Sequence, residues 1–219
     1  MKNILFIGNS YTFFNDMPSL FEDLAKENGQ NCKVTSVTKG GRKLFHNTEK
    51  DDEFATLIKE TASNSNYYAV FLQDQSLIAI DSPDDFKKGI SSHITLFKAD
   101  RYILYSTWGR KEGSDKLTER SLTSGEMTAL IAKSYAEAAK ENNAEVSNVG
   151  LAFKYISDNY PDIELYNPDL SHPSYDGSCL AAMVHYYSVF GELPTHTSSL
   201  ELSDEKISAF ISAVKKSSK

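Results

Sequence analysis

Residues 2–12 of the chain read KNILFIGNSYT, and this stretch decides the fold class. The four apolar residues at positions 4–7 are typical of a strand that is buried on both faces of a parallel sheet. The Gly8-Asn9 pair that follows predicts a turn, because both residue types tolerate unusual backbone angles. Ser10 is not needed for that turn. We therefore consider Ser10 either as a helix N-cap or as a nucleophile at the carboxyl end of the first strand.

Short apolar runs alternate with helical patterns along the rest of the chain. Further strands are expected at residues 33–38, 68–72, 102–106 and 145–151, and the first of these is polar enough to lie near an edge. Helices are expected at residues 18–28, 53–62, from 82 onward, 125–142, 174–190 and 203–216. This alternation predicts an α/β fold in which a parallel sheet of about five strands is covered by helices on both faces. No linker interrupts the pattern, so we expect a single domain over residues 1–219. The polar stretch 109–124 is either a mobile flap or an exposed connection.

Composition limits the partners and the compartment. The 219 residues carry a net charge of −7 with a pI of about 5.3, so the chain lacks the basic footprint that nucleic acids and anionic membranes require. No apolar run approaches the ~18 residues of a membrane span. The first residues show no signal-peptide pattern, so we expect a cytoplasmic protein, although a trimmed secreted chain would read the same way. Cys32 and Cys179 form no ligand motif and are expected to be buried thiols.

Residues with catalytic chemistry stand directly after the expected strands. In a parallel α/β sheet, ligands bind beyond the carboxyl ends of the strands. The first strand is followed by Ser10, the second by a glycine pair that ends in Gly41, the third by Gln73 and Gln75, and the fourth by Trp108. We therefore expect these residues to meet at one edge of the sheet.

These residue types suit acyl transfer. Ser10 is the candidate nucleophile, and His172, which precedes a late helix, is the candidate base that removes its proton. Asp169 precedes His172 by three positions and can orient the other ring nitrogen as the third member of a triad. The developing oxyanion needs aimed donors. We expect these to be the backbone N–H groups of Ser10 and Gly41 and the side-chain amide of Gln75.

Four sequence blocks, in order, resemble those of the SGNH hydrolases, also called GDSL-type esterases and lipases. ILFIGNSYT at 4–12 resembles the first block, with Asn9 where Asp is usual. TKGGRKL at 38–44 resembles the second, LQDQS at 72–76 the third, and DLSHP at 169–173 the last. The resemblance implies a flavodoxin-like three-layer α/β/α sandwich. It also implies ester hydrolysis without a metal or other cofactor.

The third block departs from the family pattern Gly-x-Asn-Asp. Gln73 stands in the place of the usual glycine and Gln75 in that of the asparagine. Gln75 can still donate through its amide, although it is one methylene longer, and Gln73 is the alternative donor. A Gln-rich third block resembles a subgroup near carbohydrate esterases, which implies short acyl groups such as O-acetyl groups on sugars. Four residues are candidates to line the substrate pocket: Asn9, Tyr11, Gln73 and Trp108. For Trp108, packing in the core or at the surface is the favoured alternative.

The reading that follows is a serine esterase acting on a small-molecule or glycan ester. The alternative is an inactive carbohydrate- or acyl-binding protein on the same fold, which the third-block glutamines motivate. A nucleotide- or flavin-binding protein is disfavoured because the chain has neither a GxGxxG nor a GxxxxGK motif.

The remaining histidines, His46, His93, His185 and His196, are expected to be ordinary core or surface residues rather than zinc ligands. Lys39, Arg42 and Lys43 read as a solvated basic loop that could at most attract an anionic substrate. No pattern in the sequence indicates the acyl length of the substrate or the oligomeric state of the protein.

Overall fold

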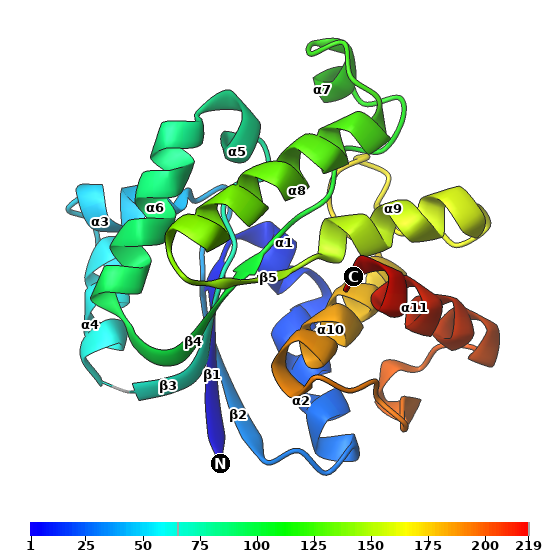
Figure 1. Ribbon diagram of the computed structural model, residues 1–219, viewed down its shortest axis with the longest axis horizontal. Coiled ribbons are helices and arrows are strands. Elements are labelled where there is room, and N and C mark those ends of the chain that lie inside the picture. The colour runs from blue at the N-terminus through cyan, green and yellow to red at the C-terminus, as the bar shows by residue number, and fades with distance from the viewer. Residues whose placement is uncertain (65, 219) are drawn as a thin grey trace.

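A sheet of five parallel strands forms the centre of the molecule (Figure 1). The computed structural model describes residues 1–64 and 66–218. Within them the strands lie in the order β2-β1-β3-β4-β5, with β1 at Lys2–Gly8, β2 at Cys32–Thr38, β3 at Asn66–Leu72, β4 at Lys98–Tyr105 and β5 at Glu145–Ser147. The predicted parallel α/β sheet is confirmed, and the polar second strand lies at its edge as expected.

Helices cover both faces of this sheet and make a three-layer sandwich (Figure 1). One face carries α2 (Met17–Glu27), α9 (Val149–Asn159), α10 (Tyr175–Phe190) and α11 (Asp204–Ser217). The other carries α4 (Glu53–Asn64), α6 (Pro83–Leu96) and α8 (Ser124–Glu141). Shorter elements complete the chain: α1 (Ser10–Phe13), η1 (Phe14–Asp16), α3 (Leu44–Glu49), α5 (Ile78–Asp81), α7 (Asp115–Thr118) and η2 (Ser198–Leu200).

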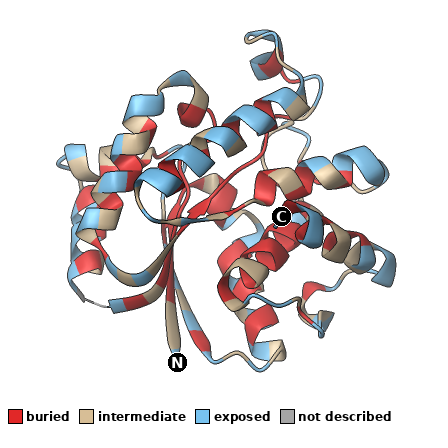
Figure 2. Ribbon diagram, viewed as in Figure 1, coloured by how far each residue is buried: buried red, intermediate tan, exposed pale blue. Residues whose placement is uncertain are grey.

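The apolar run at residues 4–7 explains why there are two helical layers. Successive side chains of a strand point to opposite faces of the sheet. Ile4 and Phe6 belong to the core shared with α2 and α10, whereas Leu5 and Ile7 belong to the core shared with α4 and α6. All four are at most 1% exposed, and Figure 2 shows the central strands as buried. A strand covered on both faces must be apolar at every position, so the run does not alternate.

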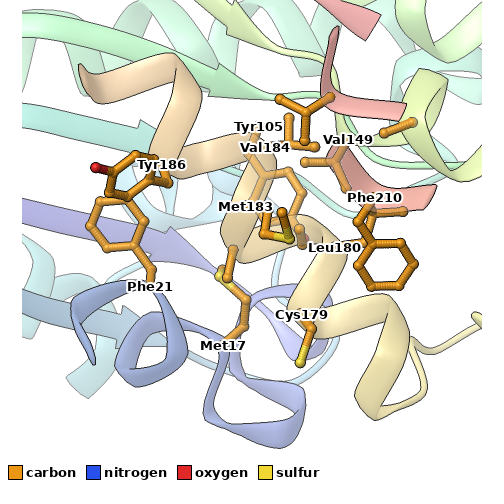
Figure 3. Close-up of a cluster of buried hydrophobic side chains, with 14 of the residues drawn as sticks. Met17, Phe21, Tyr105, Val149, Cys179, Leu180, Met183, Val184, Tyr186 and Phe210 are labelled. Atoms are coloured by element: carbon orange, nitrogen blue, oxygen red, sulfur yellow. The ribbon is translucent and has the colours of Figure 1, made fainter. Parts of the chain in front are cut away.

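Helix α10 is buried on nearly every side. Figure 3 shows Leu180 and Met183 of α10 between Met17 of α2 and Phe210 of α11, and Tyr186 of α10 beside Phe21 of α2. A helix that is hydrophobic all round must be enclosed by neighbours, and α2, α9 and α11 enclose this one. Cys179 lies on the same helix, and both it and Cys32 are buried free thiols.

The strand expected at residues 145–151 is wrong in its second half. Strand β5 ends at Ser147, and Val149 begins α9. The N–H of Gly150 donates to the carbonyl of Ser106 (3.0 Å), and a Cβ at Gly150 would lie 2.1 Å from the carbonyl oxygen of Thr107. The apolar start of α9 is therefore buried against the chain that leaves β4. A short run of apolar residues without a helical or strand period occurs both in buried strands and at the buried start of a helix, so the sequence did not distinguish the two.

The expected helices are all present, with ends shifted by one or two residues. The polar stretch 109–124 contains the short helix α7, which Figure 1 shows projecting beyond α8. Arg120 ties this stretch to α5 through an ion pair with Asp81 (2.6 Å). Its first two residues, 109 and 110, are buried rather than exposed. Across the described residues, no helix combines the length and the hydrophobicity that crossing a bilayer would take.

Candidate active site

Asn9, rather than Ser10, caps the helix that follows the first strand. The Oδ1 atom of Asn9 accepts a hydrogen bond from the N–H of Tyr11 (3.2 Å), which is the N-cap interaction of α1. The Nδ2 atom of Asn9 donates to the carbonyl of Arg42 (3.1 Å) and so links the first sequence block to the second. The capping alternative for Ser10 is therefore not needed, and the Ser10 hydroxyl is free for another partner.

That partner is His172, from the other end of the chain. The Nε2 atom of His172 lies 2.8 Å from the Oγ of Ser10. The Nδ1 atom of the same ring lies 2.5 Å from the Oδ2 of Asp169. The second carboxylate oxygen, Oδ1, accepts from the N–H groups of Ser171 (3.0 Å) and His172 (2.9 Å). The three residues predicted as a triad thus form one continuous chain of hydrogen bonds.

The Asp169 carboxyl remains ionised in this setting. Partial burial acts to raise its pKa, but hydrogen bonds from the His172 ring and from the two backbone N–H groups lower the pKa overall. An ionised carboxylate accepts the Nδ1–H of His172, which leaves Nε2 as the ring nitrogen able to take a proton from Ser10.

The loop that carries Asp169 and His172 is held by the segment that follows β4. Trp108 Nε1 donates to the carbonyl of Ser171 (3.0 Å), and the N–H of Lys111 donates to the carbonyl of Leu170 (3.0 Å). The ring of Phe14 stacks on the His172 imidazole, with centroids 4.3 Å apart and an interplanar angle of 11°. Backbone bonds fix the position of the loop, and the stacked ring fixes the orientation of the imidazole.

Three hydrogen-bond donors belong to residues that border a cavity of about 270 Å³. They are the backbone N–H groups of Ser10 and Gly41 and the side-chain amide of Gln75, and none of them has a partner among residues 1–64 and 66–218. Gly41 has a φ of +65°, a conformation that favours glycine, and a Cβ there would meet nothing within 4 Å. The residues around the cavity are Asn9, Ser10, Tyr11, Gly41, Gln75, Arg110, Ser171 and His172.

Gln73 is committed to the scaffold, which separates it from Gln75. Its Oε1 accepts from the N–H of Asn9 (2.8 Å) and from the hydroxyl of Thr12 (2.9 Å), and its Nε2 donates to the carbonyl of Asp74. A Cβ at Gly8 would lie 2.5 Å from this Oε1, so the glycine of the first block is needed to admit the glutamine. Of the two third-block glutamines, only Gln75 presents an unpaired amide to the cavity in the part of the chain described.

Two of the four residues predicted to line the pocket do not line it. Asn9 and Tyr11 do, but Gln73 and Trp108 are 1% and 0% exposed and lie behind the cavity wall. Trp108 stacks face to face on Phe153, with centroids 3.9 Å apart. Both positions follow a strand, but a strand-end residue can point into the layers as readily as toward the ligand edge. Their side chains instead hold residues of the cavity wall, because Gln73 accepts from the N–H of Asn9 and Trp108 donates to the carbonyl of Ser171.

The sequence analysis missed two residues of the cavity wall, the polar Ser171 and the charged Arg110. Arg110 is 8% exposed. Its place two residues after Trp108, at the carboxyl end of β4, was the available signal, but the polar run around it hid that position. The predicted basic loop also needs correction, because Arg42 is buried and paired with Asp52 (2.6 Å) rather than solvated.

A buried carboxyl, Asp74, joins the second and third blocks behind the cavity. Its Oδ1 accepts from the N–H of Leu44 (2.9 Å) and the N–H of Gln75 (2.7 Å), while its Oδ2 has no partner among the described side chains and backbone groups. Burial raises the pKa of Asp74 to about 7, against the lowering effect of the two N–H groups. Asp74 therefore holds the backbone of Gln75 in place. Its carboxylate takes up a proton at a higher pH than an exposed carboxylate does.

The other histidines lie away from this cavity. His93 and His185 are fully buried, where His93 contacts Asn47 and His185 contacts Ser147. His46 and His196 do not form part of the cavity wall. Over the described ranges, no group of three His, Cys, Asp or Glu residues comes together as a metal site.

Solved structures similar to this chain include three with informative names. A candidate SGNH hydrolase from Slackia heliotrinireducens is 28% identical, with a TM-score of 0.74 over 84% of this chain and 97% of that one. A DUF4886 family protein from Bacteroides uniformis is 14% identical, with a TM-score of 0.79 over 98% and 93% of the two chains. The acetyl xylan esterase AlAXEase is 16% identical, with a TM-score of 0.65 over 86% and 100%.

Neither a protein-family model nor a curated protein matches the chain significantly. The two more distant structural likenesses concern the fold alone, whereas the Slackia protein shares the fold and more than a quarter of the aligned residues. The family resemblance expected from the sequence is therefore confirmed: the chain is similar to the SGNH hydrolases, as a variant with a Gln-rich third block.

Proposed function

We propose that the protein is a serine esterase that hydrolyses carboxylic esters through Ser10, His172 and Asp169. The observation that carries this proposal is the hydrogen-bonded chain from the Ser10 hydroxyl through the His172 ring to the Asp169 carboxylate, at 2.8 Å and 2.5 Å. A serine hydroxyl is a weak nucleophile until a base takes its proton, and an oriented imidazole is the base that proteins use most often.

The reaction would proceed in two halves. In the first, Ser10 Oγ attacks the ester carbonyl as its proton passes to His172 Nε2, and the alcohol then leaves with that proton. In the second, His172 takes a proton from water as the resulting hydroxide attacks the acyl-enzyme. The tetrahedral intermediate then releases the acid while the His172 imidazolium returns its proton to Ser10 Oγ. Asp169 stabilises the imidazolium formed in each half. The N–H groups of Ser10 and Gly41 and the amide of Gln75 bind the oxyanion of both intermediates.

The cavity supports short acyl groups. Its volume of about 270 Å³ is below the ~300–1,000 Å³ typical of pockets for drug-sized ligands. The similarity to the acetyl xylan esterase AlAXEase agrees with an acetyl ester on a carbohydrate as one substrate to test, but that likeness concerns the fold. We therefore place short esters of small alcohols and sugars first among the candidate substrates.

A fluorophosphonate probe tests this proposal directly. Such a probe reacts with a serine that is activated by a base and an oxyanion hole. We expect mass spectrometry of the digested protein to locate the adduct on Ser10, and a Ser10→Ala variant to take up no label. Absence of label on folded wild-type protein would contradict the proposal and would favour the inactive binding protein as the reading.

A further inference from the structure

Arg110 is a buried cation without a partner at the wall of the candidate active site. Its side chain makes no hydrogen bond or ion pair with any described residue, and its Nη1 atom is inaccessible to solvent and unpaired. Its guanidinium lies over the ring of Tyr11, 5.4 Å from the centroid. Tyr11 and Arg110 both form part of the cavity wall beside Ser10. The cation is therefore next to the proposed reaction centre and has no anion of its own.

The other three arginines of the chain differ in this respect. Arg42 pairs with Asp52, Arg101 with Glu145 and Arg120 with Asp81, each at 2.6 Å. In all three pairs, the carboxylate that neutralises the arginine belongs to the same chain. Arg110 is the exception, although it is more buried than Arg101 and Arg120, which are intermediate in exposure.

Burying an unpaired guanidinium is costly, and the protein offers little compensation. Burial lowers the pKa of Arg110, and the charge of Asp169 acts in the opposite direction from beyond ion-pair distance. A guanidinium nevertheless stays protonated in proteins. A buried charge is normally paired or hydrogen-bonded, and an anion that enters the cavity would supply Arg110 with such a partner.

We propose that Arg110 binds a carboxylate carried by the ester substrate, so that the enzyme selects singly charged anionic esters. This inference rests on the proposed esterase function and names its substrate class. The planar fork of a guanidinium matches a carboxylate with two parallel hydrogen bonds. Within residues 1–64 and 66–218, Arg110 is also the only Lys or Arg of the cavity wall, and a single cation suits a single negative charge.

Paired substrates test the proposal on both sides of the ester bond. For the alcohol side, 3-acetoxybenzoate is compared with its neutral amide, 3-acetoxybenzamide. For the acyl side, the 4-nitrophenyl monoester of glutaric acid is compared with the ester of the corresponding glutaric monoamide. The measured quantity is the ratio of kcat/KM for the charged ester to kcat/KM for its neutral partner. The Ser10→Ala variant supplies the background rate.

We expect the wild-type ratio to exceed one for at least one pair. Arg110→Gln should lower that ratio by about 10- to 100-fold, the range of a hydrogen bond to a charged group. Arg110→Lys should restore part of it, because a lysine keeps the charge but lacks the fork. Arg120→Gln is the matched control, since this arginine is paired outside the cavity, and it should leave the ratio unchanged.

A purely structural role would give a different result. If Arg110 only supports the Tyr11 ring, Arg110→Gln lowers kcat/KM equally for charged and neutral esters, and the proposal is wrong. It is also wrong if neither wild-type ratio exceeds one. Failure of the esterase function itself is recognised separately, by unlabelled Ser10 with the fluorophosphonate probe. In that case, thermal shift with the singly charged 3-acetoxybenzoate still decides, because wild type should be stabilised and Arg110→Gln should not.

Discussion

The Nε2 atom of His172 lies 2.8 Å from the Oγ of Ser10, although 162 positions of sequence separate the two residues. Each is held by its own neighbours. Asn9 caps the helix that begins at Ser10, and Trp108 holds the carbonyl beside His172. The contact is thus the meeting point of two independently fixed backbones, and such preorganisation is what a proton transfer requires.

Replacing Ser10 by alanine should abolish turnover. Residues of a triad act as a unit, so we expect kcat for a short ester to fall by about a millionfold. Melting temperature should stay near that of wild type, because the hydroxyl contributes one partly exposed hydrogen bond. Ser19→Ala, at an exposed site on α2, is the control and should retain full activity. Residual turnover of more than one part in a thousand in the Ser10→Ala protein would argue against this nucleophile.

Asp169→Asn should impair the reaction while leaving binding intact. An asparagine can present its amide to Nδ1 and so stabilise the wrong tautomer of His172, and a loss of about 10⁴-fold in kcat is the expected scale for such a change. Steady-state kinetics with a short ester would measure it. Asp162→Asn, at an exposed position outside the cavity wall, serves as the comparison. Equal kcat values for the two variants would remove Asp169 from the mechanism.

The two third-block glutamines should separate cleanly in their effects. Gln75→Ala removes an oxyanion donor, so kcat should fall by about 10²- to 10³-fold with little change in stability. Gln73→Ala strands the N–H of Asn9 and the hydroxyl of Thr12, both buried, which should lower the free energy of unfolding by about 1–3 kcal/mol. Kinetics and urea denaturation of both variants would test this. A Gln73→Ala protein with normal stability would contradict the scaffold role.

Asp74 should make stability depend on pH. Burial raises its pKa in the folded protein to about 7, above the ~3.9 of an unfolded chain. The folded state therefore binds more protons between about pH 4 and 7, and the free energy of unfolding should fall as pH rises through that window, by at most about 1.4 kcal/mol per unit. Asp74→Asn keeps the Oδ1 acceptor for Leu44 and Gln75 but cannot ionise.

Urea denaturation at several pH values compares this variant with wild type. The stability of Asp74→Asn relative to wild type should increase from pH 4 to pH 8. Parallel pH profiles for the two proteins would mean that Asp74 does not titrate in this range.

Local patterns predicted much of this molecule because they record burial and backbone freedom. The apolar run at 4–7 reports a strand covered on both faces, and the helix signals around 82–85 fixed the start of α6 within one residue. Ser10, Gly41, Gln75, Asp169 and His172 could be grouped because parallel strands end at one edge of the sheet. The structure brings these five residues together, and their proposed roles await the tests above.

The wrong predictions have one physical origin. The direction in which a side chain points, and the residue with which it pairs, are set by residues far away in the sequence. Trp108 and Gln73 were placed in the pocket because they follow strands, but Phe153 and Asn9 draw their side chains inward. The sequence predicts a solvated Arg42 because it does not show the ion pair with Asp52. The place of Arg110 soon after β4 was a weak signal that the polar run around it hid, and sequence does not show that its buried side chain lacks a partner. The start of α9 was read as strand because its burial depends on the chain near Thr107.

The distance along the chain between Ser10 and His172 also determines when the proposed site can first exist during synthesis. Ser10 leaves the ribosome first, and the imidazole follows only after 162 further positions, about 10–30 s later at ordinary elongation rates. Helix α10, which follows His172, must then pack on α2 and receive α11 before its apolar surface is covered. A nascent or truncated chain thus carries a serine without its base. On this topology, the proposed hydrolysis can begin only after the residues up to the end of α10 have been made.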